Sequence, residues 1–324
     1  MKVIKFEQFG GPEVLQWADA DKPAPAENEV LIEVKASGVN YADTARREGQ
    51  YVVPTKLPYI PGAEVAGEIV EIGSGVKNFK QGDRVVALIE SNGYSEFVPV
   101  DSRVLTPIPD GVDYEQAVAL PLQGLSAYHV LKTMGRLEPG ESVLIHAAAG
   151  GVGAIAVQLA RIFGAGKIIA TASTEEKLQH AKAMGATHLV NYSEEGWADK
   201  VKEITEGKGV DVALEMVGGE VFNQTVKCLA PFGRLVIFGA ASGEQATFHP
   251  GQLMRKNQSV IGFFLPQIMR KPELFQSSFK ELLGYMASGE LKLTIGGTFP
   301  LQEAAHAHEL LQGRKTIGKL VLKP

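Results

Sequence analysis

The chain has 324 residues and a formal net charge of −5, from 32 Lys and Arg against 37 Asp and Glu. This acidic balance argues against a general nucleic-acid-binding protein, which needs a basic surface to meet phosphates. The single cysteine can neither form an internal disulfide nor supply a cysteine-rich zinc site, so we expect a reducing, cytoplasmic compartment. The start lacks an apolar signal core and no apolar run reaches about 18 residues, so we expect no membrane span.

The first 120 residues have the texture of a mostly β domain. Short strand-like runs are separated by glycine and proline, which is typical of a compact barrel or sandwich. The length of the chain favours about two domains at roughly 150 residues each. The expected strands are 30–34, 66–72, 84–88 and 96–100.

After residue 120, strand-like runs alternate with helical stretches. Such alternation predicts βαβ units, a parallel sheet and helices on both of its faces. The expected strands are 142–147, 167–172, 188–191, 210–217, 234–239 and 254–264, and the expected helices are 152–163, 175–184, 194–206, 220–229 and 273–288. The run 319–322 is again strand-like, and we expect it to pair with the first domain.

A glycine loop is the strongest local motif. The segment His-Ala-Ala-Ala-Gly-Gly-Val-Gly at 146–153 follows an apolar strand and opens an apolar helix. Gly150 would let the backbone approach a pyrophosphate, and Gly153 would let helix and strand pack closely. The helix N-terminus would supply free N–H groups to the phosphates. A β-to-α turn without a ligand is the alternative, since Ala148 replaces the first glycine of the fingerprint. The expected cofactor contacts of the loop are Ala149, Gly150, Gly151, Val152 and Gly153.

The end of the next strand predicts NADP rather than NAD. A free ribose 2′-hydroxyl usually meets an acidic residue here, but this strand ends in Ala-Ser-Thr at 172–174. Ser173 and Lys177 suit a 2′-phosphate, because lysine meets phosphate as a point charge. A solvated helix lysine is the alternative for Lys177. Glu175 and Glu176 are close by, where they favour the helix N-terminus.

In its layout the chain resembles the medium-chain dehydrogenase/reductase superfamily. Four segments are similar to its quinone oxidoreductase (zeta-crystallin-like) branch, namely 36–43, 61–64, 82–85 and 146–153. The resemblance implies an α/β protein with a mostly β, GroES-like catalytic domain at 1–120, completed by 265–324. It also implies a doubly wound Rossmann domain with a parallel sheet at 121–264, which binds NADPH.

The zinc ligands of related alcohol dehydrogenases are missing. The matching positions here are Asn40, Ala63 and Gln123, none of which is a good zinc ligand. Cys228, the only cysteine, is expected to be a small buried hydrophobe. His306 and His308 are two residues apart, which on a helix points them to different sides. We therefore expect no metal. Without zinc to stabilise an alkoxide, the acceptor must delocalise the charge itself, as a quinone or an α,β-unsaturated carbonyl does.

The resemblance also supplies candidate site residues. It places Asn40, Tyr51 and Gln123 at the reaction, with Asn40 as a donor to a carbonyl oxygen and a contact of the cofactor. A turn residue is the alternative for Asn40, and a loop aromatic for Tyr51. Ala45 stands where some relatives have another tyrosine. The further cofactor contacts that the resemblance implies are Ser126, Tyr192, Phe238, Phe264 and Arg314.

These observations predict an NADPH-dependent, zinc-independent reductase of quinones or enones. Hydride would pass directly from the cofactor, and the proton would come from water or a tyrosine. Two alternatives stay open: an enoyl-thioester reductase of the same superfamily, and a nucleotide-binding protein without turnover. We expect a small-molecule partner, no nucleic acid and no membrane. The resemblance suggests a homodimer through an edge strand at 259–264.

Overall fold

The computed structural model describes all residues from 1 to 324 and divides them into two compact units. The first unit comprises 1–122 and 293–324, and the second comprises 123–292. The second unit thus includes 265–292, which the family resemblance had placed in the first domain. The reason lies in helix α9 (Pro272–Ala287), whose Glu281 accepts hydrogen bonds from Tyr128 Oη at 2.6 Å and Lys132 Nζ at 3.0 Å.

The first unit is built on a mostly antiparallel seven-stranded sheet, as its strand-like texture predicted. Strand order is β14-β15-β3-β4-β5-β7, with β6 also paired to β3, and a separate hairpin of β1 and β2 accompanies it. Alternate residues of β3, such as Val30, Ile32 and Val34, enter one apolar core. The strands are β1 (Lys2–Lys5), β2 (Gln16–Asp19), β3 (Glu29–Val39), β4 (Glu64–Ile72), β5 (Arg84–Leu88), β6 (Phe97–Asp101), β7 (Leu105–Pro107), β14 (Ile295–Pro300) and β15 (Lys319–Lys323).

The C-terminal strand returns to the first unit, as expected. β15 runs antiparallel to β3, with Leu320 opposite Val39 and Leu322 opposite Ser37. The helical elements of this unit are η1 (Pro12–Val14), α1 (Tyr41–Arg47), η2 (Ser102–Val104), α2 (Tyr114–Val118), η5 (Leu301–Glu303) and α10 (Ala304–Gln312). Helix α3 (Pro121–Tyr128) begins where the first unit ends.

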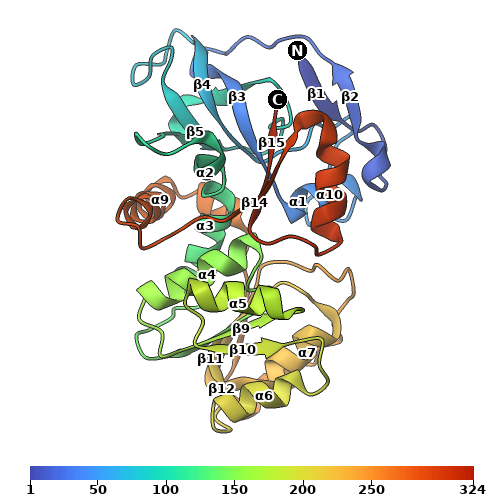
Figure 1. Ribbon diagram of the computed structural model, residues 1–324, viewed down its shortest axis with the longest axis vertical. Helices are drawn as coiled ribbons and strands as arrows, with labels where there is room; N and C mark the ends of the chain where they lie inside the picture. Colours follow the sequence, from blue (N-terminus) through green and yellow to red (C-terminus); the bar gives the residue numbers. More distant parts are fainter. The chain divides into compact units, whose positions relative to one another are not determined.

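The second unit contains the predicted parallel sheet (Figure 1), in the order β10-β9-β8-β11-β12-β13. This is a doubly wound order, because the chain starts at β8 in the middle and builds outward in both directions. The strands are β8 (Ser142–Ile145), β9 (Lys167–Ala172), β10 (His188–Asn191), β11 (Val210–Glu215), β12 (Leu229–Ile237) and β13 (Ser259–Gly262). The helices are η3 (His129–Met134), α4 (Gly151–Ile162), α5 (Glu175–Met184), α6 (Trp197–Ile204), α7 (Gly219–Lys227), η4 (Pro250–Lys256), α8 (Leu265–Met269) and α9.

The expectation of one strand over 254–264 is wrong in its first part. Residues Pro250–Lys256 form a 3₁₀ helix, which ends at Asn257 with a left-handed φ of +52°. Only Ser259–Gly262 then pair with β12. Short apolar runs do not distinguish a strand from a helical turn, which is why the pattern misled here.

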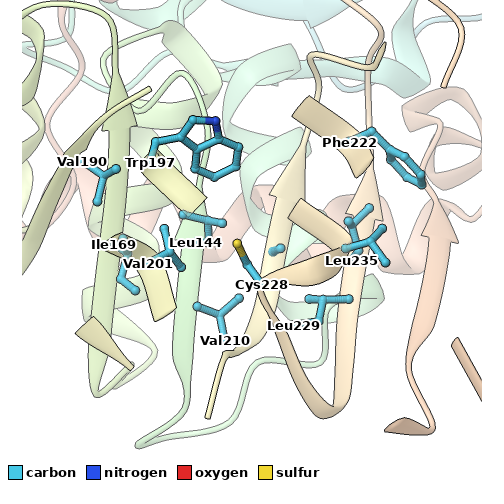
Figure 2. Packing of buried hydrophobic residues seen from close by; sticks show 12 residues of the cluster. Leu144, Ile169, Val190, Trp197, Val201, Val210, Phe222, Cys228, Leu229 and Leu235 are labelled. Atoms are coloured by element: carbon cyan, nitrogen blue, oxygen red, sulfur yellow. The ribbon is translucent and has the colours of Figure 1, made fainter. Parts of the chain in front are cut away.

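Cys228 lies in the core of the second unit, as predicted. Figure 2 shows Cys228 within the apolar cluster that also contains Trp197, Val201 and Phe222, and its Sγ lies 3.6 Å from Ala198 O on α6. The residue is fully buried, and burial raises the pKa of its thiol to about 11. Cys228 is therefore a packing residue and carries no reactive thiolate.

None of the helices combines the length and apolarity that a bilayer span requires.

A buried histidine, directly after β8, links strand β9 to helix α7 in this core. His146 Nδ1 lies 2.9 Å from Thr171 Oγ1, and Nε2 lies 2.8 Å from Thr225 Oγ1. The imidazole is 2 % exposed, and burial lowers the pKa of His146 to about 4. The neutral ring therefore stabilises the fold above pH 6.5, and this stabilisation is lost as the pH falls from 6.5 towards 4.

We expect the free energy of unfolding of the wild type to fall more steeply than that of a His146→Asn variant between pH 7 and pH 5. The difference should be about 2 kcal/mol, since each unit of pKa shift is worth about 1.4 kcal/mol. Urea unfolding at the two pH values measures it. A His306→Asn variant is the control, because His306 is half-exposed. Parallel pH profiles for the wild type and His146→Asn would contradict the assignment.

Candidate functional site

The carboxyl edge of the parallel sheet collects most of the predicted cofactor contacts. The glycine loop follows β8, Ser173 follows β9 and Tyr192 follows β10, while Phe238 and Phe264 come after β12 and β13. Because all six strands are parallel, their carboxyl ends share one edge, which is where doubly wound sheets bind ligands. The topology thus places these residues along one edge of the sheet.

In the glycine loop, Gly153 lies against backbone atoms and leaves no room for a side chain. A Cβ at Gly153 would lie 2.2 Å from Ala147 O and 2.8 Å from Ala148 Cα. A Cβ at Gly150 would meet only Ala147 O, at 3.2 Å, so the loop is open on that side. Gly150 is also the N-cap of α4. An open loop at the start of a twelve-residue helix fits a pyrophosphate group.

Gln123 packs directly on this loop. A Cβ at Gly151 would lie 2.1 Å from Gln123 Oε1, so a larger residue at 151 would displace the glutamine side chain. Gln123 and Ser126, both on α3, are 9 % and 6 % exposed. The structure therefore joins Gln123 to the glycine loop, a contact that the sequence did not reveal.

The ends of the paired strands β9 and β10 carry the residues that the sequence assigns to a 2′-phosphate. Tyr192 N donates to Ala172 O at 3.1 Å, which places the start of the Tyr192 loop beside Ser173. Thr174 caps α5 by accepting a hydrogen bond from Lys177 N at 3.4 Å. Lys177 is therefore in the first turn of α5, half-buried, and no acidic residue ends β9. This donor set fits a 2′-phosphate.

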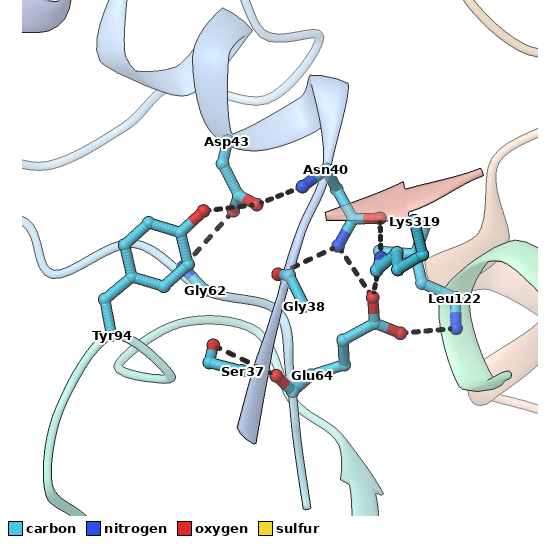
Figure 3. A network of polar contacts seen from close by, with 9 residues as sticks. All are labelled: Ser37, Gly38, Asn40, Asp43, Gly62, Glu64, Tyr94, Leu122 and Lys319. Atoms are coloured by element: carbon cyan, nitrogen blue, oxygen red, sulfur yellow. Dashed lines mark hydrogen bonds and ion pairs between the residues drawn. The ribbon is translucent and has the colours of Figure 1, made fainter. Parts of the chain in front are cut away.

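In the first unit, Asn40 belongs to a buried polar cluster (Figure 3). Lys319 Nζ donates to Asn40 Oδ1 at 2.7 Å and to Glu64 Oε1, and Asn40 Nδ2 donates to Glu64 Oε1 at 2.9 Å. Glu64 Oε2 accepts from Leu122 N at 2.8 Å. The side chains of Glu64 and Lys319 are 0 % and 1 % exposed. The cluster is charge-neutral, and it uses the amide of Asn40 for internal contacts.

A second buried hydrogen-bond network starts from Asp43 on α1. Its carboxylate accepts hydrogen bonds from Asn40 N at 2.9 Å, Gly62 N at 3.2 Å and Tyr94 Oη at 3.4 Å. Burial raises the pKa of Asp43 to about 6, although the hydrogen bonds from Asn40 N and Gly62 N lower it. The aspartate thus holds the start of α1 to the loop at Gly62.

The network continues through Tyr94 to His308 and Arg47, and the donor and acceptor of each hydrogen bond follow from the arginine. Arg47 Nη1 lies 3.2 Å from His308 Nδ1, and a guanidinium only donates, so Nδ1 accepts. His308 Nε2 then carries the proton and donates to Tyr94 Oη, 3.1 Å away. Burial lowers the pKa of His308 to about 3, which agrees with a neutral ring. His306 points elsewhere, 3.7 Å from Glu309, as the spacing predicted.

Tyr51 and Arg314 lie in different settings. Tyr51 is half-buried and its ring lies 4.1 Å from the Arg46 guanidinium carbon. Burial raises the pKa of Tyr51, and Arg46 opposes the rise. Its hydroxyl therefore stays protonated at neutral pH and is able to donate. Arg314 follows α10 with a left-handed φ of +54° and is exposed.

Several site residues were missed by sequence reasoning. Lys319 was treated only as part of the returning strand, although a lysine inside an apolar run is itself a signal of a buried partner. Tyr94 carries no local signal. Glu215, at the end of β11, is 1 % exposed, and burial raises its pKa while its Oε1 accepts from Val217 N and Gly218 N. It fixes the turn into α7 at the same sheet edge.

The positions of the zinc ligands hold no metal-binding set. Asn40 is engaged with Glu64 and Lys319, Ala63 has no donor side chain, and Gln123 packs on the glycine loop. No group of three or more His, Cys, Asp or Glu side chains is arranged to hold a metal ion.

Comparison with known proteins places these features in a family. Residues 26–110 match the model of the alcohol dehydrogenase GroES-like domain, and residues 151–287 match that of the zinc-binding dehydrogenase domain. The chain is 39% identical to quinone oxidoreductase of Pseudomonas aeruginosa over 325 residues, which cover 100% of this chain and 99% of that protein. It is 36% identical to human quinone oxidoreductase, with 99% and 97% covered.

Solved structures give the same result. The Escherichia coli quinone oxidoreductase complexed with NADPH superposes with a TM-score of 0.95 at 38% identity, covering 100% of both chains. A mycobacterial protein complexed with NADPH has a TM-score of 0.94 at 37% identity, again covering 100% of both. The match to these enzymes extends over the whole chain and agrees with the GroES-like and Rossmann folds and with the glycine loop. The chain is therefore an oxidoreductase and belongs to the quinone oxidoreductase family of the medium-chain dehydrogenase/reductase superfamily.

Proposed function

We propose that this protein is an NADPH-dependent reductase that transfers hydride to quinones or other α,β-unsaturated carbonyls without a metal ion. The observation that carries the proposal is the hydrogen bonding of the Asn40 side chain. Where related dehydrogenases have a zinc ligand, its amide bonds to Glu64 and Lys319 in a buried, charge-neutral cluster. A site without a Lewis acid suits an acceptor that spreads the developing charge over its own conjugated system.

The cofactor would supply the hydride, and the net reaction is NADPH + H⁺ + quinone → NADP⁺ + hydroquinone. The glycine loop at 150–153 would bind the pyrophosphate, while Ser173, Lys177 and Tyr192 would hold the 2′-phosphate. Phe238, Phe264, Ser126 and Arg314 are the further contacts that the resemblance suggests.

The protein's share of the chemistry is positioning and proton donation. Tyr51 is the proton donor we favour, since burial keeps its hydroxyl protonated. Gln123 would fix the glycine loop and thereby the bound cofactor. Asn40 would act by shaping the start of α1 and not as a free amide donor, because Glu64 and Gly38 accept from its Nδ2 at 2.9 Å and 3.4 Å.

The direct test is NADPH oxidation with 1,4-benzoquinone, a simple enone and an enoyl thioester as separate acceptors. We expect turnover of the quinone, the enone or both, and little with the thioester. Preference for the thioester would favour an enoyl-thioester reductase. Tight NADPH binding without oxidation by any acceptor would favour a nucleotide-binding protein without turnover.

The same assay tests metal independence. Prolonged treatment with a chelator is expected to leave kcat unchanged, and elemental analysis should find no stoichiometric zinc. Loss of activity together with loss of bound zinc would overturn this part of the proposal.

Lys177 should decide the choice between NADPH and NADH. In Lys177→Ala we expect the KM for NADPH to rise by about tenfold or more and that for NADH to change little, since a charge-assisted hydrogen bond is worth roughly 1.5–3 kcal/mol. The ratio of kcat/KM for the two cofactors in wild type and variant measures this. Lys182→Ala, later on the same helix, is the matched control. An equal loss for both cofactors would remove Lys177 from the site.

A homodimer through β13 is the assembly we propose. β13 is the last strand of the six-stranded sheet, and only β12 pairs with it. An open edge is a ready template for a second copy of the chain. Light scattering should give twice the mass of one chain. The Val260→Pro variant should give a lower mass, because proline removes an N–H donor from the edge strand.

A further inference from the structure

Arg46, on helix α1, carries a charge that no acidic side chain neutralises. It is half-buried and takes part in no ion pair. Its Nη1 donates to a neutral acceptor, Thr55 Oγ1, at 3.5 Å. A guanidinium has five N–H donors, and besides Thr55 only the Tyr51 hydroxyl takes one of them, so N–H donors remain for a ligand.

Two tyrosines hold this guanidinium in place. Its central carbon lies 4.1 Å from the centre of the Tyr51 ring and 5.5 Å from that of Tyr59. Tyr59 is itself fixed, because its backbone pairs with Phe6 and its hydroxyl donates to Glu90 O at 3.2 Å. The ring faces orient the planar group, and one N–H also donates to the Tyr51 hydroxyl. The charge is therefore preorganised before any ligand arrives.

The neighbouring charged residues on α1 show how different Arg46 is. Arg47 is fully buried and bonds to Glu48 Oε1 at 2.7 Å and Gln312 Oε1 at 2.8 Å. The Asp43 carboxylate accepts hydrogen bonds from Asn40 N, Gly62 N and Tyr94 Oη. These residues support the fold, whereas Arg46 stabilises no opposite charge within the chain.

The loop that follows α1 contains Thr55, the hydrogen-bond acceptor of Arg46, and also carries exposed apolar side chains. Val52, Val53 and Leu57 are 75%, 42% and 38% exposed. An apolar surface beside an oriented guanidinium matches a ligand that is aromatic or aliphatic in its body and anionic at one end.

We propose that Arg46, held by Tyr51 and Tyr59, binds an acidic substituent of the substrate, so that this chain prefers conjugated acceptors carrying a carboxylate or sulfonate. The inference rests on the proposed function, in which Tyr51 lies beside the acceptor. It makes Arg46 a specificity-determining residue, since an uncharged acceptor gains nothing from the guanidinium.

The test compares 1,2-naphthoquinone with 1,2-naphthoquinone-4-sulfonate in NADPH oxidation. The measured quantity is the ratio of kcat/KM for the sulfonated over the unsubstituted quinone, which cancels their different intrinsic reactivities when variants are compared. We expect Arg46→Met to lower this ratio by about tenfold, or about 1.4 kcal/mol, mainly through the KM of the sulfonate. Arg46→Lys should lower it less, because the charge remains but the planar fork is lost.

Lys56→Met is the matched control, since it removes one positive charge from the same exposed loop. A ratio that stays constant in Arg46→Met would show that Arg46 only supports the loop, and equal falls in Arg46→Met and Lys56→Met would show a general field effect. Either outcome overturns the inference and leaves the proposed function intact. Oxidation of NADPH by neither quinone nor by the enone would overturn the proposed function and the inference with it. If Arg46→Met does not fold, Arg46→Gln, which also removes the charge but keeps a polar side chain, takes its place against Lys56→Met.

Discussion

The Lys319→Met variant is expected to lose about 3–5 kcal/mol of unfolding free energy, because it leaves a buried carboxylate without its cation. Glu64 and Lys319 are 0 % and 1 % exposed. The other partners of Glu64, Asn40 Nδ2 and Leu122 N, are neutral donors. Methionine keeps most of the length of the lysine side chain, so the charge is the main difference. Urea unfolding at pH 7 measures the loss.

Two further variants show whether the buried charge is the cause. Lys323→Met removes a lysine from the same strand, but its side chain is 51% exposed and pairs with Glu115 at 2.7 Å, so the loss should stay below about 1 kcal/mol. Combining Glu64→Gln with Lys319→Met should recover part of the loss, because neither charge then remains buried. Equal losses for the two lysine variants would refute the argument.

The Gly153→Val variant is expected to weaken both the fold and NADPH binding. A Cβ there would lie 2.2 Å from Ala147 O and 2.8 Å from Ala148 Cα, and neither backbone atom yields as a flexible side chain would. The start of α4 must shift, which should cost about 1–3 kcal/mol of stability. We expect NADPH affinity to fall by about tenfold or more, or about 1.4 kcal/mol per decade. Urea unfolding and titration calorimetry measure the two effects.

Gly150→Ala separates the two effects. Gly150 has a φ of −74°, which alanine adopts without strain, and a Cβ there meets only Ala147 O at 3.2 Å. Unfolding free energy should therefore change by less than about 0.5 kcal/mol, while NADPH affinity falls if the backbone approaches the pyrophosphate here. Unchanged NADPH affinity in Gly153→Val would show that the loop does not bind the cofactor.

Much of the second unit could be predicted from sequence alone. Its strands and helices follow from hydrophobic periodicity over ten to twenty residues, which reports backbone geometry and burial directly. Once the strands are parallel, the residues after each strand share one edge, so Ser173, Tyr192 and Phe238 could be grouped without coordinates. The error at 254–264 arose because a short apolar run indicates burial but does not distinguish a strand from a helical turn. The assignment of 265–292 to the first domain came from the family resemblance, whereas the contacts of this segment fall in the second unit.

The amino-acid sequence by itself determined the two fold classes, the glycine loop and the lack of zinc ligands at Asn40, Ala63 and Gln123, because each depends on residue type and short-range spacing. Only the tertiary structure decided how the polar side chains pair. Lys319 reaches Asn40 across 279 positions of the chain, and His308 reaches Arg47 across 261. Such contacts form because burial in one core leaves each polar group no partner but another buried group, and that choice depends on how the distant strands and helices pack.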